Sequence, residues 1–465
     1  MGRGPARSPW GVRLLLGAVL LGGGALVVSR SGSNRGSQSG QGNGPAALAG
    51  GDAGGRRLRG KPKGMRELPT TSADIYLGNL DEQIGELTRL TREHPDLVAN
   101  LMLLSTAHHS RGRLKDDLDE IQLGIDETTQ CIALAHDDAD TPKGARQDAK
   151  CYLMRAEQEQ SLHRFGEARG DLAKARELGI DGTPIDDLET ELDWNAGLYA
   201  ASIPKLRAMR LARPSTSTWI REAQLEHDLG HEPEADAAFE AAEDRISDTN
   251  PLIVAHLNVQ RGTQKVHTGK LEEAIVFFRE ATVRVPTHIA ALEHLAETLG
   301  MAGRHAESAA LYEKVVTLSD DPEFAHALAH EYAAIGGHEK EAAALEAKAK
   351  EGYARLVAKY PEAMYWHASE YYMAVGDVAR ALELLRKNVV LRPGSPSMVA
   401  LARAELANGR KDDAKASIDK ALAMPLVSAD LFWTASRVYG ANGDAKSAGA
   451  FRARAEAINP HVAEE

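Results

Sequence analysis

A spacing of 34 residues between glycines constrains the fold of this chain more than any other feature. Gly269, Gly303 and Gly337 lie 34 residues apart, and so do Gly409 and Gly443. Small, bulky and proline residues follow these glycines at recurring offsets. A period of this length indicates stacked helical hairpins, each of which buries its apolar face only against its neighbours. The repeat therefore predicts an all-α solenoid built by addition of similar units.

The same phase extends over most of the chain, with steps that vary by a few residues. The positions that share it are Gly78, Gly112, His163, Gly197, Gly230, Gly269, Gly303, Gly337, Gly376, Gly409 and Gly443. Small residues recur in both helices of each copy, including Ala156, Ala223, Ala296 and Ala402 in first helices and Ala168, Ala235, Ala274 and Ala381 in second helices. This pattern resembles the tetratricopeptide repeat, a helix-turn-helix binding module, over about residues 72–460. The resemblance implies a right-handed superhelix of ten to eleven antiparallel hairpins.

Two features near the start depart from this regular pattern. A capping box at Asn79 predicts a first helix that ends before Pro95. The long step from Gly112 to His163 predicts an extended helix to about His136, followed by a loop.

The first 29 residues form a targeting or anchoring segment. Arg3, Arg7 and Arg13 precede an uncharged apolar run from Leu14 to Val28. This run suits a secretory signal and is short for a membrane span of about 20 residues, so a cleaved signal peptide and a single-pass transmembrane helix both stay open. Either way, arginines ahead of the run keep the N-terminus in the cytoplasm and place the array in the periplasm or another extracytoplasmic space.

Charge divides the chain at the end of a linker. Residues 30–66 are rich in Gly and Ser and end in a basic run, which predicts a disordered linker, and residues 67–465 form the solenoid. Residues 1–64 carry ten Arg or Lys and one acid, whereas the remainder carries 45 basic and 66 acidic residues. An acidic array repels phosphate backbones, which argues against nucleic acid as a partner.

Cys131 and Cys151 are equally distant from the middle of the predicted loop in the long repeat. An antiparallel hairpin puts such residues at equal heights, and a disulfide fits export from the cytoplasm. The alternative is a pair of buried thiols that act as small apolar side chains.

The resemblance implies that the first helices line a concave groove. At its C-terminal end these helices supply Trp366, Arg403, Trp433 and Arg437. Arginine holds carboxylates and tryptophan offers flat contact area, so we expect these four residues to bind a partner. In the alternative interpretation, the tryptophans fill gaps between hairpins and the arginines pair with local acids. No repeat has the Lys and Asn pair with which related proteins hold the terminal carboxylate of a chaperone.

A second group of groove residues suggests a metal ligand set, although the hypothesis is weak. His326 and His330 share one helical face, and neighbouring helices offer Glu293, Glu297 and Glu370. Two imidazoles and a carboxylate form a known zinc arrangement. This placement depends on whether Gly336 or Gly337 occupies the turn position. The sequence has no HExxH motif, and surface histidines are usually ordinary polar residues, so no metal or other cofactor is expected.

The sequence also lacks GxSxG, P-loop and CxxC motifs and an appended catalytic domain. We therefore expect a non-enzymatic scaffold that binds a protein or peptide partner at a bacterial cell envelope. The alternatives are a self-associating structural protein and a metal-dependent enzyme that uses His326 and His330.

Overall fold

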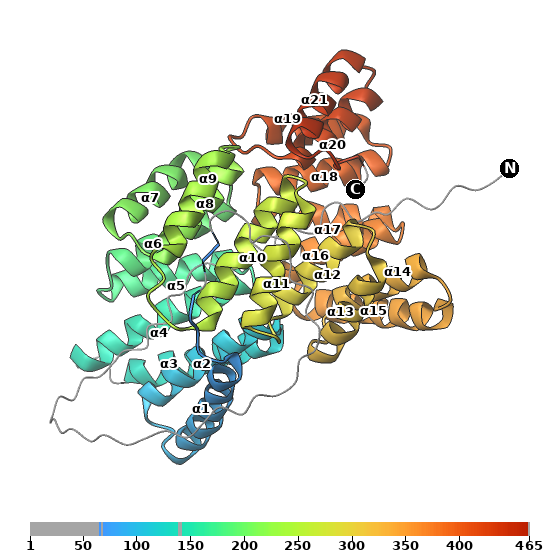
Figure 1. Ribbon diagram of the computed structural model, residues 1–465. Helices are drawn as coiled ribbons and strands as arrows, with labels where there is room; N and C mark the ends of the chain where they lie inside the picture. Colours follow the sequence, from blue (N-terminus) through green and yellow to red (C-terminus); the bar gives the residue numbers. More distant parts are fainter. Residues whose placement is uncertain (1–64, 67, 138–141, 464–465) are drawn as a thin grey trace.

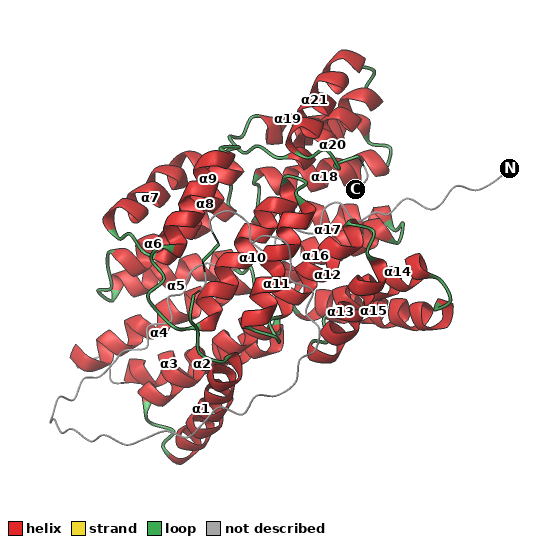
Figure 2. Ribbon diagram, viewed as in Figure 1, coloured by secondary structure: helices red, strands yellow, loops and turns green. Residues whose placement is uncertain are grey.

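The computed structural model describes residues 65–66, 68–137 and 142–463. These ranges hold 21 α-helices and no strands (Figures 1 and 2). The first eleven helices are α1 (Ala73–Glu93), α2 (Val98–Lys115), α3 (Leu118–Asp137), α4 (Pro142–Ser161), α5 (Phe165–Glu177), α6 (Thr183–Asn195), α7 (Tyr199–Ala212), α8 (Thr216–Asp228), α9 (Glu232–Glu243), α10 (Pro251–His267) and α11 (Leu271–Arg284). The others are α12 (Ile289–Met301), α13 (His305–Leu318), α14 (Pro322–Ile335), α15 (Glu339–Lys359), α16 (Pro361–Ala374), α17 (Val378–Leu391), α18 (Ser395–Ala407), α19 (Lys411–Leu422), α20 (Ala429–Ala441) and α21 (Ala445–Ile458).

The helices from α2 onward pack as ten consecutive hairpins, which confirms the predicted all-α solenoid. Each even-numbered helix packs against the helix that follows it in the chain. It also contacts the first helix of the next hairpin in pairs such as α2 with α4, α10 with α12 and α18 with α20. Helix α1 precedes the first hairpin. It begins at Ala73, earlier than the capping box at Asn79 predicted.

Small residues allow the two helices of a hairpin to approach closely. Ala156, Ala223, Ala296 and Ala402 in first helices are completely buried. At Gly262, an added Cβ would lie 2.4 Å from Cε1 of Phe278 in the partner helix. The sequence pattern of small residues therefore reports direct contact between helices.

The turns inside most hairpins hold one residue in the left-handed backbone region. Gly303 has a φ of 72°, and His163 takes the equivalent position with a φ of 57°. Two of the predicted turn glycines are not in turns. Gly78 lies inside α1 and Gly112 inside α2, where the turn residue is Asp116. Gly112 has instead a packing role, because a Cβ there would lie 2.8 Å from Ile121.

The turn between α14 and α15 departs from the others. Gly336 and Gly337 both have positive φ angles, of 81° and 80°. Two consecutive residues with positive φ explain why either glycine fits the turn position of the repeat. This conformation favours glycine at both positions, since a Cβ there meets the following carbonyl oxygen.

The superhelix turns far enough for its C-terminal half to contact its N-terminal half. Turns inside early hairpins meet loops between later hairpins, and we call this line of contacts the seam. The backbone N–H of Ser395 donates to the Tyr199 hydroxyl at 3.2 Å, and the hydroxyl of Tyr360 donates to Asp119 at 2.5 Å. In Figure 1 the loop before α20 meets the hairpin of α8 and α9 near the top of the view.

Apolar packing continues across the seam. One core cluster joins Ile121, Ile125 and Leu162 of the early hairpins to residues of α15 and α16 that include Tyr353 and Met364. Because these groups lie far apart in the sequence, the array is closed by tertiary contacts in addition to neighbour-to-neighbour stacking.

The residues before α1 cross the outer edge of hairpins that come later in the chain. Arg66 forms an ion pair with Asp244 at 2.7 Å, and the N–H of Thr71 donates to Thr249. Arg284 donates to the carbonyl oxygen of Leu68 at 2.6 Å. The chain therefore enters the array beside α9, α10 and α11.

The predicted leader of residues 1–29 and nearly all of the linker of residues 30–66 lie outside the described residues. None of the helices in the described ranges combines the length and apolar character that a membrane span requires. The position of the segment relative to a membrane stays a prediction.

Candidate functional site

First helices from several hairpins bring basic groups together on the inner face of the superhelix. The positive charge of Arg113 on α2 favours a lower pKa for Glu157 of α4 and for His256 of α10. Arg221 of α8 belongs to the same group and forms an ion pair with Glu191. Burial, with Arg113 and other cationic neighbours, lowers the pKa of His256 to about 3. The His256 imidazole beside Arg113 and Arg221 therefore stays neutral at physiological pH.

Glu157 also lies on this face. Its side chain is solvent-exposed, yet desolvation raises the pKa of Glu157 to about 7 against the influence of Arg113. Charged and polar side chains of α2, α4, α8 and α10 therefore lie close together on this face.

Acidic groups gather on the other side of the same face. Asp116 follows α2 in a left-handed conformation and faces α12, α14 and α16. Burial and the carboxylates of Glu323 and Glu293 raise the pKa of Asp116 against the influence of His367. Burial and Asp116 also raise the pKa of Asp321 to about 7. Arg113 and Arg221 thus lie in one part of this face, and the carboxylates of Asp116, Glu293 and Glu323 lie together in another.

Two of the four predicted partner-binding residues are engaged within the protein. Trp366 is only 3% exposed and packs with Leu382 and Leu401, so the prediction that it presents a contact surface is wrong. Arg403 forms ion pairs with Glu370 at 3.2 Å and Asp430 at 3.3 Å. For both residues the structure agrees with the alternative interpretation, namely gap filling and local pairing.

The other two predicted residues are accessible. Arg437 on α20 is exposed and makes no ion pair within the described ranges. Trp433, one helical turn away on the same helix, is half-buried, and the guanidinium of Arg452 lies 5.6 Å from the centre of its ring. We call Trp433, Arg437 and Arg452 the C-terminal surface. Its role in binding stays a prediction.

The predicted metal ligand set is not assembled as expected. Nδ1 of His326 contacts Glu346 of α15 and its ring packs edge-on against Tyr371, while Glu370 pairs with Arg403. Among the described residues, the group with metal-binding geometry is Glu293, His294 and Glu297, and neither His326 nor His330 is part of it. His294 was missed from the sequence because its position in the repeat is not one of those assigned to the groove, and its ring lies against Phe278 of α11.

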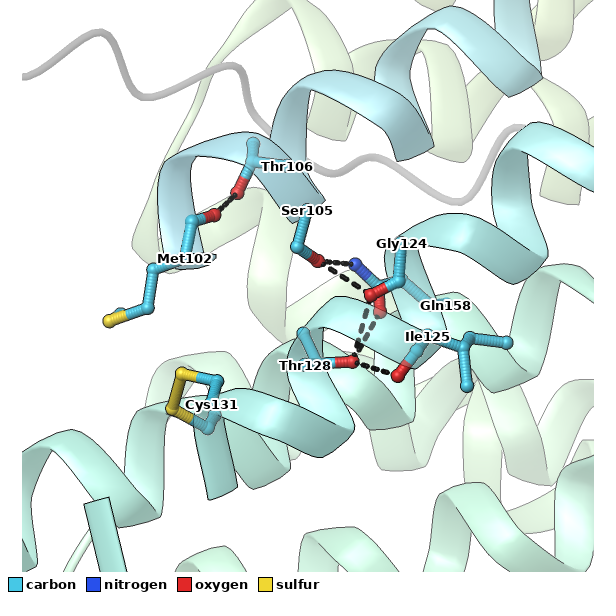
Figure 3. The surroundings of a disulfide bond; sticks show 9 residues. Met102, Ser105, Thr106, Gly124, Ile125, Thr128, Cys131 and Gln158 are labelled. Atoms are coloured by element: carbon cyan, nitrogen blue, oxygen red, sulfur yellow. Dashed lines mark hydrogen bonds between the residues drawn. A yellow bond between two sulfur atoms is a disulfide. The ribbon is translucent and has the colours of Figure 1, made fainter. Parts of the chain in front are cut away.

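Cys131 and Cys151 join α3 to α4 (Figure 3). Their Sγ atoms are bonded and their Cα atoms are 6.0 Å apart, within the range that a disulfide requires. Close by, the buried side chain of Gln158 links Ser105 of α2 to Thr128 of α3. The disulfide and this polar network hold the first two hairpins together.

Comparisons with known proteins assign no function to this chain. No protein-family model matches the sequence, and no curated protein matches it. Several solved structures resemble the chain. The Cut9–Hcn1 structure of the APC/C is 12% identical, with 83% of this chain and 85% of that chain covered and a TM-score of 0.38. A human IFIT1 dimer with PPP-AAAA is 13% identical, with coverages of 81% and 94% and a TM-score of 0.39.

A tetratricopeptide repeat protein from Parabacteroides merdae is 16% identical, with 53% of this chain and 94% of that chain covered and a TM-score of 0.33. These likenesses carry no argument about partners or activity. The fold assignment depends on the repeat spacing and on the helix pairing described above.

Proposed function

We propose that this solenoid of tetratricopeptide-type hairpins is a non-enzymatic scaffold that binds a protein or peptide partner at a bacterial cell envelope. The observation that carries the proposal is the C-terminal surface. It offers an exposed arginine beside a half-buried tryptophan on an array that is otherwise acidic.

The chemistry of this surface favours an acidic segment of the partner. Arg437 has no internal carboxylate to satisfy it within the described residues, so its guanidinium is available to a carboxylate of another chain. Trp433 adds flat apolar area at little entropic cost, and such aromatic residues often dominate the binding energy of an interface. Arg403 differs, because Glu370 and Asp430 already occupy its guanidinium.

The proposed attachment to a membrane depends on the N-terminal segment. The apolar run from Leu14 to Val28 is the candidate anchor. The linker predicted for residues 30–66 would have a root-mean-square reach of roughly 30–35 Å. The contacts of Arg66 and Thr71 support attachment of this linker beside α9 and α10, so the C-terminal surface stays free for a partner.

Affinity capture with the full-length chain tests the proposal. The bait is compared with an Arg437→Glu variant and with Arg386→Glu, a matched control that makes the same charge change at an exposed arginine of α17. Partners identified by mass spectrometry should be lost with Arg437→Glu and retained with Arg386→Glu. Equal capture by both variants would move the binding site elsewhere.

Self-association is the second candidate function, and the seam favours it. The turns at Gly197, Gly230 and Gly269 are covered by later parts of the same chain. In the equivalent turns, a Cβ added at Gly376 or at Gly409 would meet no atom within 4 Å in the described structure. A second copy that repeats the seam contacts would cover this free edge in a head-to-tail manner. Light scattering over a range of concentrations measures the molar mass in solution and so tests self-association. A strict monomer is inconsistent with self-assembly.

A further inference from the structure

Three potential metal ligands lie together on one helix of the inner face. Glu293, His294 and Glu297 project from α12, and one ligand atom from each lies within 4.8 Å of the other two. The spacing explains this arrangement, because residues one turn apart on a helix have neighbouring side chains. His294 adds an imidazole at the side of the two carboxylates.

All three side chains are withdrawn from water. Glu293 is 8% exposed, His294 is 5% exposed and Glu297 is 3% exposed. Buried carboxylates are costly unless a cation or several hydrogen bonds compensate for the loss of hydration. The group therefore needs positive charge or hydrogen-bond donors beside it.

The imidazole of His294 meets this requirement incompletely. Its Nδ1 lies 2.6 Å from Oε2 of Glu293, but the geometry is not that of a hydrogen bond. Its Nε2 also has no hydrogen-bond partner in the described residues. A polar ring that is buried in this way is normally hydrogen-bonded, and a ring nitrogen without such a bond is free to coordinate a metal.

The surroundings add negative charge. Asp116 from the end of α2 and Glu323 from α14 both lie close enough for an electrostatic interaction with His294. Glu323 is paired with His367 at 3.3 Å. No arginine or lysine forms an ion pair with Glu293 or Asp116 in the described residues. Three helices thus direct carboxylates toward one region of the inner face.

We propose that Glu293, His294 and Glu297 bind a divalent transition-metal ion, with zinc as the probe ion, and that Asp116 or a water molecule completes its coordination. Two carboxylates and one imidazole suit zinc and similar ions better than magnesium or calcium, which prefer oxygen ligands only. With Asp116 as a ligand, the ion links α2 to α12 across the inner face. This site is independent of the C-terminal surface.

Metal analysis of the full-length chain, purified without a histidine tag, tests the site. After removal of metal with a chelator and dialysis against zinc, the native chain should retain about one equivalent. His294→Gln and Glu297→Gln should each weaken zinc binding by at least about tenfold, because each removes one ligand. Glu331→Gln is the matched control, since Glu331 is a buried carboxylate that pairs with His305 outside the group. Its zinc affinity should equal that of the native chain.

Cobalt provides a second readout. The cobalt-loaded native chain should show visible absorption bands, and both ligand variants should lack them. Absence of retained zinc and of these bands in the native chain would overturn the proposal, even if a variant failed to fold. Undiminished zinc binding by a folded His294→Gln variant would overturn it as well.

Discussion

The backbone N–H of Val427 donates a hydrogen bond to the carbonyl oxygen of Asp228 at a distance of 2.8 Å. Val427 precedes α20 and Asp228 ends α8, so this bond joins two hairpins that the 34-residue repeat does not make neighbours. Similar contacts at Tyr199 and Ser395 and at Gly269 and Asn459 place the seam along the whole middle of the array. Stability in this protein therefore has a long-range component that an open repeat array lacks.

Substitution of two turn glycines measures how much the seam contributes to stability. Gly269 and Gly303 have the same φ of 72°, but a Cβ at Gly269 would lie 2.5 Å from Oδ1 of Asn459, and one at Gly303 would meet nothing within 4 Å. Gly303→Ala should cost about 1 kcal/mol because of its left-handed backbone alone. Gly269→Ala should cost about 1–3 kcal/mol more because it also displaces the seam. Urea unfolding measures both costs, and equal values would show that the seam contributes nothing at Gly269.

The disulfide should stabilise the first hairpins. Cys131 and Cys151 are separated by 20 residues, and a loop of that size gives about 3 kcal/mol by the chain-entropy estimate. Replacement of both cysteines by serine should lower the free energy of unfolding by about that amount. Thiol titration of the denatured, unreduced protein should find no reactive thiol. Two reactive thiols before reduction would rule out the bridge in the protein as purified.

The two arginines of the predicted partner site should differ in their effect on stability. Arg403→Ala leaves Glu370 and Asp430 without their cation, and all three side chains are largely withdrawn from water. We expect a loss of about 1–3 kcal/mol. Arg437→Ala removes an exposed side chain and should change stability by less than about 0.5 kcal/mol. Thermal unfolding of the two variants checks this difference, and similar losses would contradict the exposed, unpaired position described for Arg437.

A buried carboxylate makes stability depend on pH. Burial raises the pKa of Glu159 to about 7, and the nearby Asp171 carboxylate adds to the shift. The unfolded chain releases this proton near pH 4.3, whereas the folded chain holds it to about pH 7, so stability falls as the pH rises between these values. Glu159→Gln removes this loss. The variant should be more stable than the native chain by about 1–3 kcal/mol at pH 8 and nearly equal to it at pH 4.5.

Urea unfolding of both chains at the two pH values gives the comparison for Glu159. The same stability difference at pH 4.5 and pH 8 would show that titration of Glu159 is not the cause.

The candidate site was predictable from the sequence only in part. The positions of Trp433 and Arg437 on one exposed helix face follow from their spacing of one turn. The burial of Trp366 does not, because it depends on Leu382 and Leu401 of the next two helices. Likewise, the sequence placed Glu293 and Glu297 together, but the contribution of Asp116 requires that α2 lie across from α12.

The sequence by itself determined the hairpins, since the 34-residue spacing, the small residues and the turn glycines act between helices that are close in the chain. It also placed Cys131 opposite Cys151 on neighbouring helices. The tertiary structure alone decided which turns are covered, which inner residues face one another and where α1 begins. The reason is physical: small rotations at each hairpin accumulate along a solenoid, and only their sum brings Val427 to Asp228.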